Sequence, residues 1–153
     1  MVVSSGSVPA IDFGGLGIRD YTAAIETSSS FAVITVPPGV AHALSWSRRS
    51  DKCYYVVTGT IEFTDSGQTH VLSTGDVCLV SQGERFSYRN RSEEPATLCL
   101  FHTPSFDLES EASEEAPPDP SQATSGWARQ TQTAAECLRW QYGRYRMKPD
   151  SFW

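Results

Sequence analysis

The stretch GVAHALSWSRRSDKCYYVVTG, residues 39–59, decides the fold predicted for this chain. It contains the run KCYYVV, whose β-branched and aromatic residues are typical of a β-strand, and it begins and ends with a glycine. Glycine adopts a positive φ at little cost because it has no Cβ, so we expect Gly39 and Gly59 to close tight turns between antiparallel strands. The stretch therefore predicts strands joined by turns.

Strand-like segments recur along the chain on both sides of this stretch. They are FAVITV, IEFT, THVL, VCLV, RFSYRN and ATLCLF, and the turn sequences PPG, DSG, STGD, SQGE and RSEEP separate them. Residues 18–30 add one or two leading strands, and the only helical pattern covers residues 134–145. Seven or so short strands at this cadence predict an all-β sandwich or closed barrel.

Composition divides the 153 residues into three parts. Residues 1–108 form the predicted β-barrel. Residues 109–126 are rich in carboxylates, proline and serine, which predicts a solvated acidic linker. Residues 127–153 form a basic, aromatic and partly helical C-terminal extension.

Charge and cysteine usage exclude several classes of protein. The net charge of −6 argues against nucleic-acid binding, although the C-terminal extension is basic. No apolar run is long enough to span a membrane, and the N-terminus lacks a secretory pattern, so we expect a cytoplasmic protein. The four cysteines occur singly, which predicts free thiols in a reducing compartment and neither a zinc knuckle nor a dithiol motif.

The spacing of the glycines resembles the two sequence motifs of the cupins over residues 31–106. The first motif is Gly, five residues, His-x-His, three or four residues, Glu, six residues, Gly, and its places fall on Gly39, Ser45, Ser47, Lys52 and Gly59. The second motif is Gly, five residues, Pro-x-Gly, two residues, His, three residues, Asn, and its places fall on Gly75, Ser81, Gly83, Phe86 and Asn90. The resemblance implies a single-domain jelly-roll barrel.

The places that hold the metal in metal-dependent cupins carry other residues here. Three histidines and a glutamate bind the ion in those relatives, and their counterparts are Ser45, Ser47, Lys52 and Phe86. An ammonium repels a divalent cation, a phenyl ring has no lone pair to donate, and neutral hydroxyls are poor ligands for first-row metals. The resemblance therefore implies no metal and no cofactor. Of the three histidines, only His102 has a plausible route into the barrel, since His42 follows the PPG turn and His70 adjoins the DSGQ turn.

Alternation along the strands predicts which side chains line the barrel. If Lys52 faces inward as its cupin counterpart does, Tyr54 faces inward too, and Glu84 shares a face with Phe86 and Tyr88. The candidate catalytic residues are Lys52, Tyr88 and His102. The candidate substrate-binding residues are Ser45, Ser47, Tyr54, Glu84 and Phe86. A buried lysine can act near neutral pH as a general base or form a Schiff base, and tyrosine and serine hydroxyls can stabilise an enolate.

Structural explanations of the same residues stay open. Lys52 could pair with Glu84, and the tyrosines could be core residues. His102 could be a hydrogen-bonded structural residue, and alternation does not decide which face of its strand it lies on.

The preferred function is a metal-independent cupin enzyme, which would be an isomerase, epimerase, dehydratase or cyclase. It would act on a small carbonyl or polyketide-like metabolite of secondary metabolism. The alternative is a non-catalytic cupin that binds or senses a small molecule. Small cupins commonly dimerise, so we expect a homodimer without nucleic-acid or membrane partners.

Overall fold

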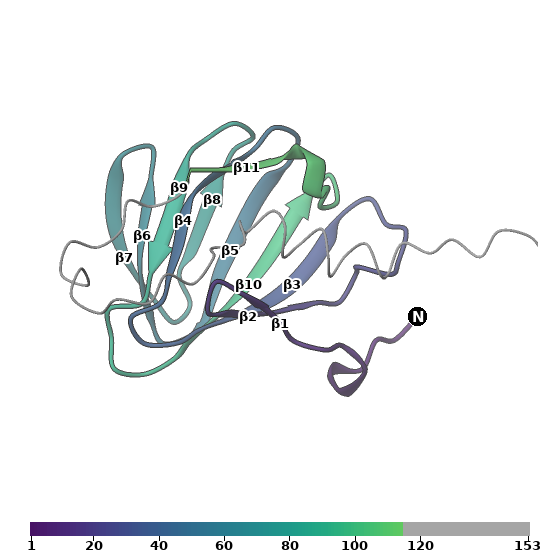
Figure 1. Ribbon diagram of the computed structural model, residues 1–153, viewed down its shortest axis with the longest axis horizontal. Coiled ribbons are helices and arrows are strands. Elements are labelled where there is room, and N and C mark those ends of the chain that lie inside the picture. Colours follow the sequence, from purple (N-terminus) through teal and green to yellow (C-terminus); the bar gives the residue numbers. More distant parts are fainter. Residues whose placement is uncertain (115–153) are drawn as a thin grey trace, which may run out of the picture. The chain divides into compact units, whose positions relative to one another are not determined.

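The computed structural model describes residues 1–114, which form two antiparallel β-sheets facing each other (Figure 1). The six-stranded sheet has the order β1 (Ile11–Phe13), β2 (Leu16–Asp20), β3 (Ser30–Val36), β10 (Ala96–Thr103), β5 (Asp51–Thr58), β8 (Val77–Val80). The five-stranded sheet has the order β11 (Glu111–Ser113), β4 (Ala41–Ser47), β9 (Phe86–Arg89), β6 (Thr60–Asp65), β7 (Gln68–Ser73). Two short 3-10 helices cover Ser5–Ser7 and Leu108–Ser110. The predicted all-β barrel is confirmed.

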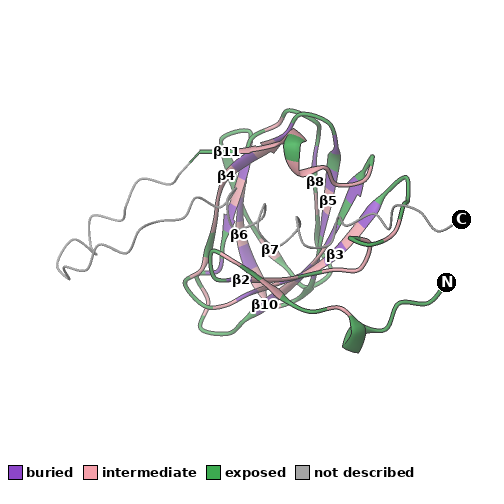
Figure 2. Ribbon diagram, turned by 45° about the vertical axis from the view of Figure 1, so that its right-hand side comes forward, coloured by how far each residue is buried: buried purple, intermediate pink, exposed green. Residues whose placement is uncertain are grey.

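The core lies between the sheets because apolar side chains alternate along the strands. Every second residue of β3 and β10 is buried, which directs Ile34, Leu98 and Leu100 inward. Buried and partly buried positions accordingly alternate along the ribbons (Figure 2). The remaining buried apolar residues are Leu16, Ala32, Val36, Tyr54, Val56, Ile61, Phe63, Val80, Phe86, Tyr88 and Ala96.

The glycines of the opening stretch adopt the predicted positive φ, 75° at Gly39 and 84° at Gly59. They differ in the space around them. A Cβ added to Gly39 would meet no atom within 4 Å, whereas one added to Gly59 would lie 2.9 Å from the Cα of Ala96 and 3.1 Å from the carbonyl oxygen of Pro95. Gly59 is therefore required by both its conformation and the close approach of the chain before β10.

We expect Gly59→Ala to lower the free energy of unfolding by about 2–4 kcal/mol, because backbone atoms must move in addition to the cost of a positive φ. Gly39→Ala is the matched control and should cost only about 1–2 kcal/mol, the penalty of the left-handed conformation alone. Urea denaturation of both variants at pH 7 measures the difference. Equal losses in the two variants would contradict the close contact at Gly59.

The beginning and the end of the barrel differ from the sequence-based boundaries. The two leading strands, β1 and β2, cover residues 11–20 and so begin earlier than the predicted segment. Residues 111–113, assigned above to the acidic linker, form β11, which pairs with β4 in the register Glu111 to Ser47. The prediction of a helix over residues 134–145, and the rest of the C-terminal extension, lie outside the described residues. Among residues 1–114, no helix has the length and apolar character needed to cross a membrane.

Candidate active site

Lys52 lies in the barrel interior and contacts Glu111 of β11. It is the second residue of β5 and pairs with Val80 of β8 and His102 of β10. Only 6% of its side chain is exposed, and its Nζ lies 2.5 Å from Oε2 of Glu111. Nζ also lies 5.2 Å from the centre of the Phe86 ring. A buried ion pair therefore occupies the interior, next to an aromatic wall.

Glu111 is a site residue that the sequence did not suggest. It reaches Lys52 because β11 pairs with β4, and because Arg48 donates its backbone N–H to the Ser110 carbonyl. Its Oε1 is buried and has no hydrogen-bond partner. The residues around it resemble an acidic linker in composition, and a strand of three residues is too short to show alternation, so no sequence signal marked it.

His102 points into the barrel, which decides between the two faces left open by alternation. Its side chain is 4% exposed, and Nδ1 lies 3.1 Å from the Ser30 hydroxyl across the β3–β10 pair. The Ser30 oxygen accepts a hydrogen bond from the Phe106 N–H, so its own proton is available to Nδ1. This pattern favours the tautomer with the proton on Nε2, an atom that is buried without a partner.

His42 also lies in the interior, and the prediction that only His102 reaches the barrel is wrong. The His42 ring stacks on Tyr88, with centroids 4.7 Å apart, and on Phe86 at 5.3 Å. The pairing of β4 with β9 shifts register between His42 and Ser45. This irregularity places both residues on the inner face, although strict alternation would put positions 42 and 45 on opposite faces.

Aromatic rings form the floor of the site. Tyr54, Phe63, Phe86 and Tyr88 are each at most 2% exposed, and their ring centroids lie 5.2–5.9 Å apart in the pairs that touch. Phe63 comes from the IEFT segment and was not among the candidates. The hydroxyl of Tyr88 is buried and has no partner, so it stays available to a bound molecule.

The structure gives the two candidate serines and Glu84 local roles. The Ser45 hydroxyl donates to the Ala43 carbonyl, and the Ser47 hydroxyl accepts from the N–H groups of Arg49 and Ser50. The Glu84 carboxylate accepts a 2.7 Å bond from the Ser81 N–H in the turn before β9. Glu84 therefore does not pair with Lys52 or join the interior, because strand alternation does not extend into a turn.

The cupin metal positions do not suit a metal ion in this chain. Both serine hydroxyls are engaged with the backbone, Lys52 carries an ammonium paired with Glu111, and Phe86 offers no donor atom. Within residues 1–114, no group of three or more histidine, cysteine or carboxylate side chains is arranged to hold a metal. The side chains gathered here are proton donors and acceptors.

Burial controls the protonation of these groups. Burial first, and then the positive charge of Lys52, lower the pKa of His42 to about 4 and that of His102 to about 3. Burial also lowers the pKa of Lys52, while the carboxylate of Glu111 opposes that shift. The pKa of Tyr88 is raised by burial. At neutral pH both imidazoles are therefore neutral.

The two histidines should make the fold sensitive to acid. Their pKa values in the folded protein lie below the unfolded value of 6.5, so below pH 6.5 the unfolded chain binds protons that the folded protein does not. We expect the free energy of unfolding to fall by up to about 1.4 kcal/mol per pH unit for each histidine, from about pH 6 down to about pH 4.

Urea denaturation at several pH values tests this expectation with His42→Gln and His102→Gln, each of which should flatten the decline. His70→Gln removes an exposed histidine of β7 and should leave the decline steep. A decline equally steep in all three variants would contradict the buried, neutral state of His42 and His102.

A jelly-roll barrel of this kind is the fold of the cupin class of protein. The family model of the cupin domain matches residues 32–102. Residues 32–102 of this chain therefore form a cupin domain. No curated protein matches it.

Several solved structures have the same fold. The nucleoside dehydratase Pac13 from Streptomyces superposes with a TM-score of 0.66 at 18% identity, over 74% of this chain and 90% of that chain. KdgF from Halomonas sp. has a TM-score of 0.63 at 17% identity, over 70% and 96%. A predicted oxalate decarboxylase from Thermotoga maritima has a TM-score of 0.60 at 23% identity, over 67% and 98%. Pac13 variants with a histidine or either of two tyrosines replaced were solved with uridine. At these identities the likeness shows the fold, and the neighbours include enzymes.

Proposed function

We propose that this chain is a metal-independent cupin enzyme that moves protons on a small carbonyl-containing metabolite. The observation that carries the proposal is the set of buried atoms without partners in the barrel interior, namely Nε2 of His102, the hydroxyl of Tyr88 and Oε1 of Glu111. Leaving such a group unpaired costs roughly 1–3 kcal/mol. Unpaired buried atoms in an interior that also holds a buried ion pair are best explained by a ligand that supplies their partners.

Loss of water from a β-hydroxy carbonyl compound is the reaction that these groups suit best. Oε1 of Glu111 would remove the proton α to the carbonyl, and the Nε2–H of His102 and the Tyr88 hydroxyl would donate hydrogen bonds to the enolate oxygen. Lys52, made more acidic by burial, would protonate the departing hydroxyl, which leaves as water.

The Lys52–Glu111 pair would then reset itself. After the elimination Glu111 holds the α-proton and Lys52 is a neutral amine. Because Nζ lies 2.5 Å from the Glu111 carboxylate, rotation of the carboxylic acid that brings the protonated Oε1 to Nζ lets the proton pass to the amine. An isomerase, epimerase or cyclase would share the first step, the removal of the α-proton, and differ in where the proton is returned.

The neighbouring folds support this choice of reaction and suggest a first group of ligands. Pac13 is a nucleoside dehydratase, and its variants were solved with uridine. In this chain the aromatic rings of His42, Phe86 and Tyr88 line the interior, and rings of this kind favour contact with a flat ring. A nucleoside is therefore one candidate beside polyketide-like compounds of secondary metabolism.

Exchange of substrate protons with solvent tests the proposal before the true substrate is known. The full chain is incubated in D2O with uridine and with a panel of small β-hydroxy aldehydes and ketones. NMR then detects deuterium at the α-carbon, and mass spectrometry detects the loss of water. We expect at least one compound to react, with His102→Gln reducing the rate about 100-fold and His70→Gln leaving it unchanged. Tight binding of a compound without exchange or turnover would instead favour the alternative of a non-catalytic sensing cupin.

A further inference from the structure

The Ser50 hydroxyl is a buried polar group that the proposed reaction does not use. Ser50 lies in the turn between β4 and β5 and is only 1% exposed. Its Oγ is one of four buried side-chain atoms without a hydrogen-bond partner among residues 1–114, and the other three are the atoms that carry the proposed function. A buried hydroxyl without a partner has lost its hydration and gained nothing in return, so it calls for a ligand or a structural explanation.

The turn around Ser50 is held by bonds that do not involve its hydroxyl. The backbone N–H of Ser50 donates to the Ser47 hydroxyl at 3.0 Å. On one side of Ser50, the Arg48 N–H donates at 2.8 Å to a carbonyl of the 3-10 helix that precedes β11. On the other side, the Asp51 carboxylate accepts a 2.8 Å bond from the Gln82 N–H. The side chain is therefore held in place, and an alanine would satisfy the turn equally well, so folding does not explain the hydroxyl.

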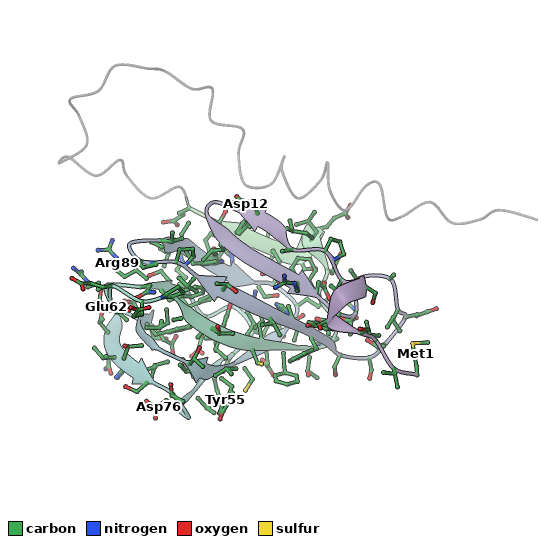
Figure 3. All side chains as sticks on the ribbon, turned by 90° about the horizontal axis from the view of Figure 1, so that it is seen from below. Met1, Asp12, Tyr55, Glu62, Asp76 and Arg89 are labelled. Atoms are coloured by element: carbon green, nitrogen blue, oxygen red, sulfur yellow. The ribbon has the colours of Figure 1, made fainter. Side chains whose placement is uncertain are left out.

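Ser50 faces the barrel interior beside the buried ion pair. Tyr55 of β5 lies on the outside of the molecule (Figure 3), and Lys52, on the opposite face of the strand, is more buried than the residue on either side of it. Ser50 precedes Lys52 by two positions, which is about 6.8 Å along a strand, and so shares its inward face. Ser47, which binds the Ser50 N–H, is paired with Glu111 of β11. The Ser50 hydroxyl is therefore close to both partners of the ion pair.

We propose that Ser50 binds a second hydroxyl group of the substrate and thereby selects a polyhydroxylated carbonyl compound, an inference that rests on the proposed function. In the proposed elimination, Lys52 protonates the hydroxyl that leaves the β-carbon. Ser50, two positions further along the same face, then meets a substituent of the γ-carbon. A serine hydroxyl can donate and accept at the same time, which suits another hydroxyl. A compound that is apolar beyond the β-carbon leaves the Ser50 hydroxyl unpaired and is selected against.

Two aldehydes that differ by one hydroxyl group test the proposal. They are 3-hydroxybutanal and 3,4-dihydroxybutanal, which share the departing hydroxyl and differ only at the γ-carbon. The rate of water loss gives kcat/KM for each compound, and calorimetry gives Kd where no water is lost. We expect the full chain to prefer 3,4-dihydroxybutanal by about 10-fold, the effect of one buried hydrogen bond. Ser50→Ala should reduce this preference to less than about 2-fold.

Ser73→Ala is the matched control. Ser73 ends β7, its hydroxyl is on an exposed residue, and its N–H donates to the Asp76 carboxylate at 2.7 Å, as the Ser50 N–H donates to a side-chain oxygen. This variant should keep the full preference. Urea denaturation adds a measurement without a ligand. Ser50→Ala should raise the urea midpoint, because it removes a buried hydroxyl that has no partner, and Ser73→Ala should leave the midpoint unchanged.

The possible outcomes separate this inference from the proposed function. If both aldehydes bind without losing water and the preference in Kd depends on Ser50, the proposed function fails and the role of Ser50 stands. A preference that survives Ser50→Ala, or the absence of any preference in the wild type, overturns the role of Ser50 even if water is lost. A lower urea midpoint in Ser50→Ala overturns it as well, since the hydroxyl would then have a structural partner. Failure of both aldehydes to bind or react overturns the proposed substrate class.

Discussion

Lys52→Met is expected to lower the free energy of unfolding by about 3–5 kcal/mol, since it leaves the Glu111 carboxylate beside an apolar side chain without its counter-ion. Lys52 is 6% exposed and the Glu111 side chain 16%, so water compensates only a small part of the loss. The double variant Lys52→Met with Glu111→Leu removes both charges and should recover stability to within about 1 kcal/mol of the wild type.

The exposed pair Arg91–Glu62 is the matched control for this experiment. Its atoms are 2.7 Å apart, comparable to the buried pair, but the two side chains are 63% and 27% exposed. Arg91→Met should therefore cost less than about 1 kcal/mol in the same urea denaturation. If Lys52→Met were no more harmful than Arg91→Met, the buried ion pair at the centre of the site would not exist.

Tyr88→Phe is expected to stabilise the protein while it reduces turnover. The Tyr88 hydroxyl is buried without a hydrogen-bond partner, so replacing it with hydrogen should raise the free energy of unfolding by about 1–2 kcal/mol. If the hydroxyl binds the enolate oxygen, the same change should lower the turnover number by about 100-fold. Denaturation and the rate of deuterium exchange measure the two effects on one preparation.

Tyr55→Phe distinguishes this result from a general effect of losing a tyrosine hydroxyl. Tyr55 is 39% exposed on β5 of the other sheet, and its replacement should change neither stability nor rate by a measurable amount. A Tyr88→Phe protein with full activity would remove Tyr88 from the mechanism, and one with lower stability would show that its hydroxyl has a structural partner.

The fold was predictable because its signals are local. Turn glycines such as Gly39 and Gly59 and the alternation along β3 and β10 are visible in the sequence, and they determine where strands end and which side chains face inward. The interior position of Lys52 was implied by the cupin resemblance, and alternation along the regular strand β5 then predicted that Tyr54 faces inward too.

The residues that the sequence missed or misplaced lie where that regularity fails. His42 is turned inward by the register shift in β4, and Glu84 belongs to a turn in which its carboxylate binds a backbone N–H. Glu111 reaches the interior through a strand of three residues whose partner, β4, lies more than sixty positions earlier in the chain. A long-range pairing of this kind leaves no periodic pattern in the sequence.

The central claim is that proton-transferring side chains take the place of a metal in this barrel. The most direct test is to purify the full chain without a chelator and to measure its metal content by mass spectrometry. Turnover or ligand binding is then measured before and after treatment with EDTA. We predict less than about a tenth of an equivalent of any transition metal per chain, and function unchanged by EDTA. One equivalent of a bound transition metal, whose removal abolishes function and whose return restores it, would contradict the account.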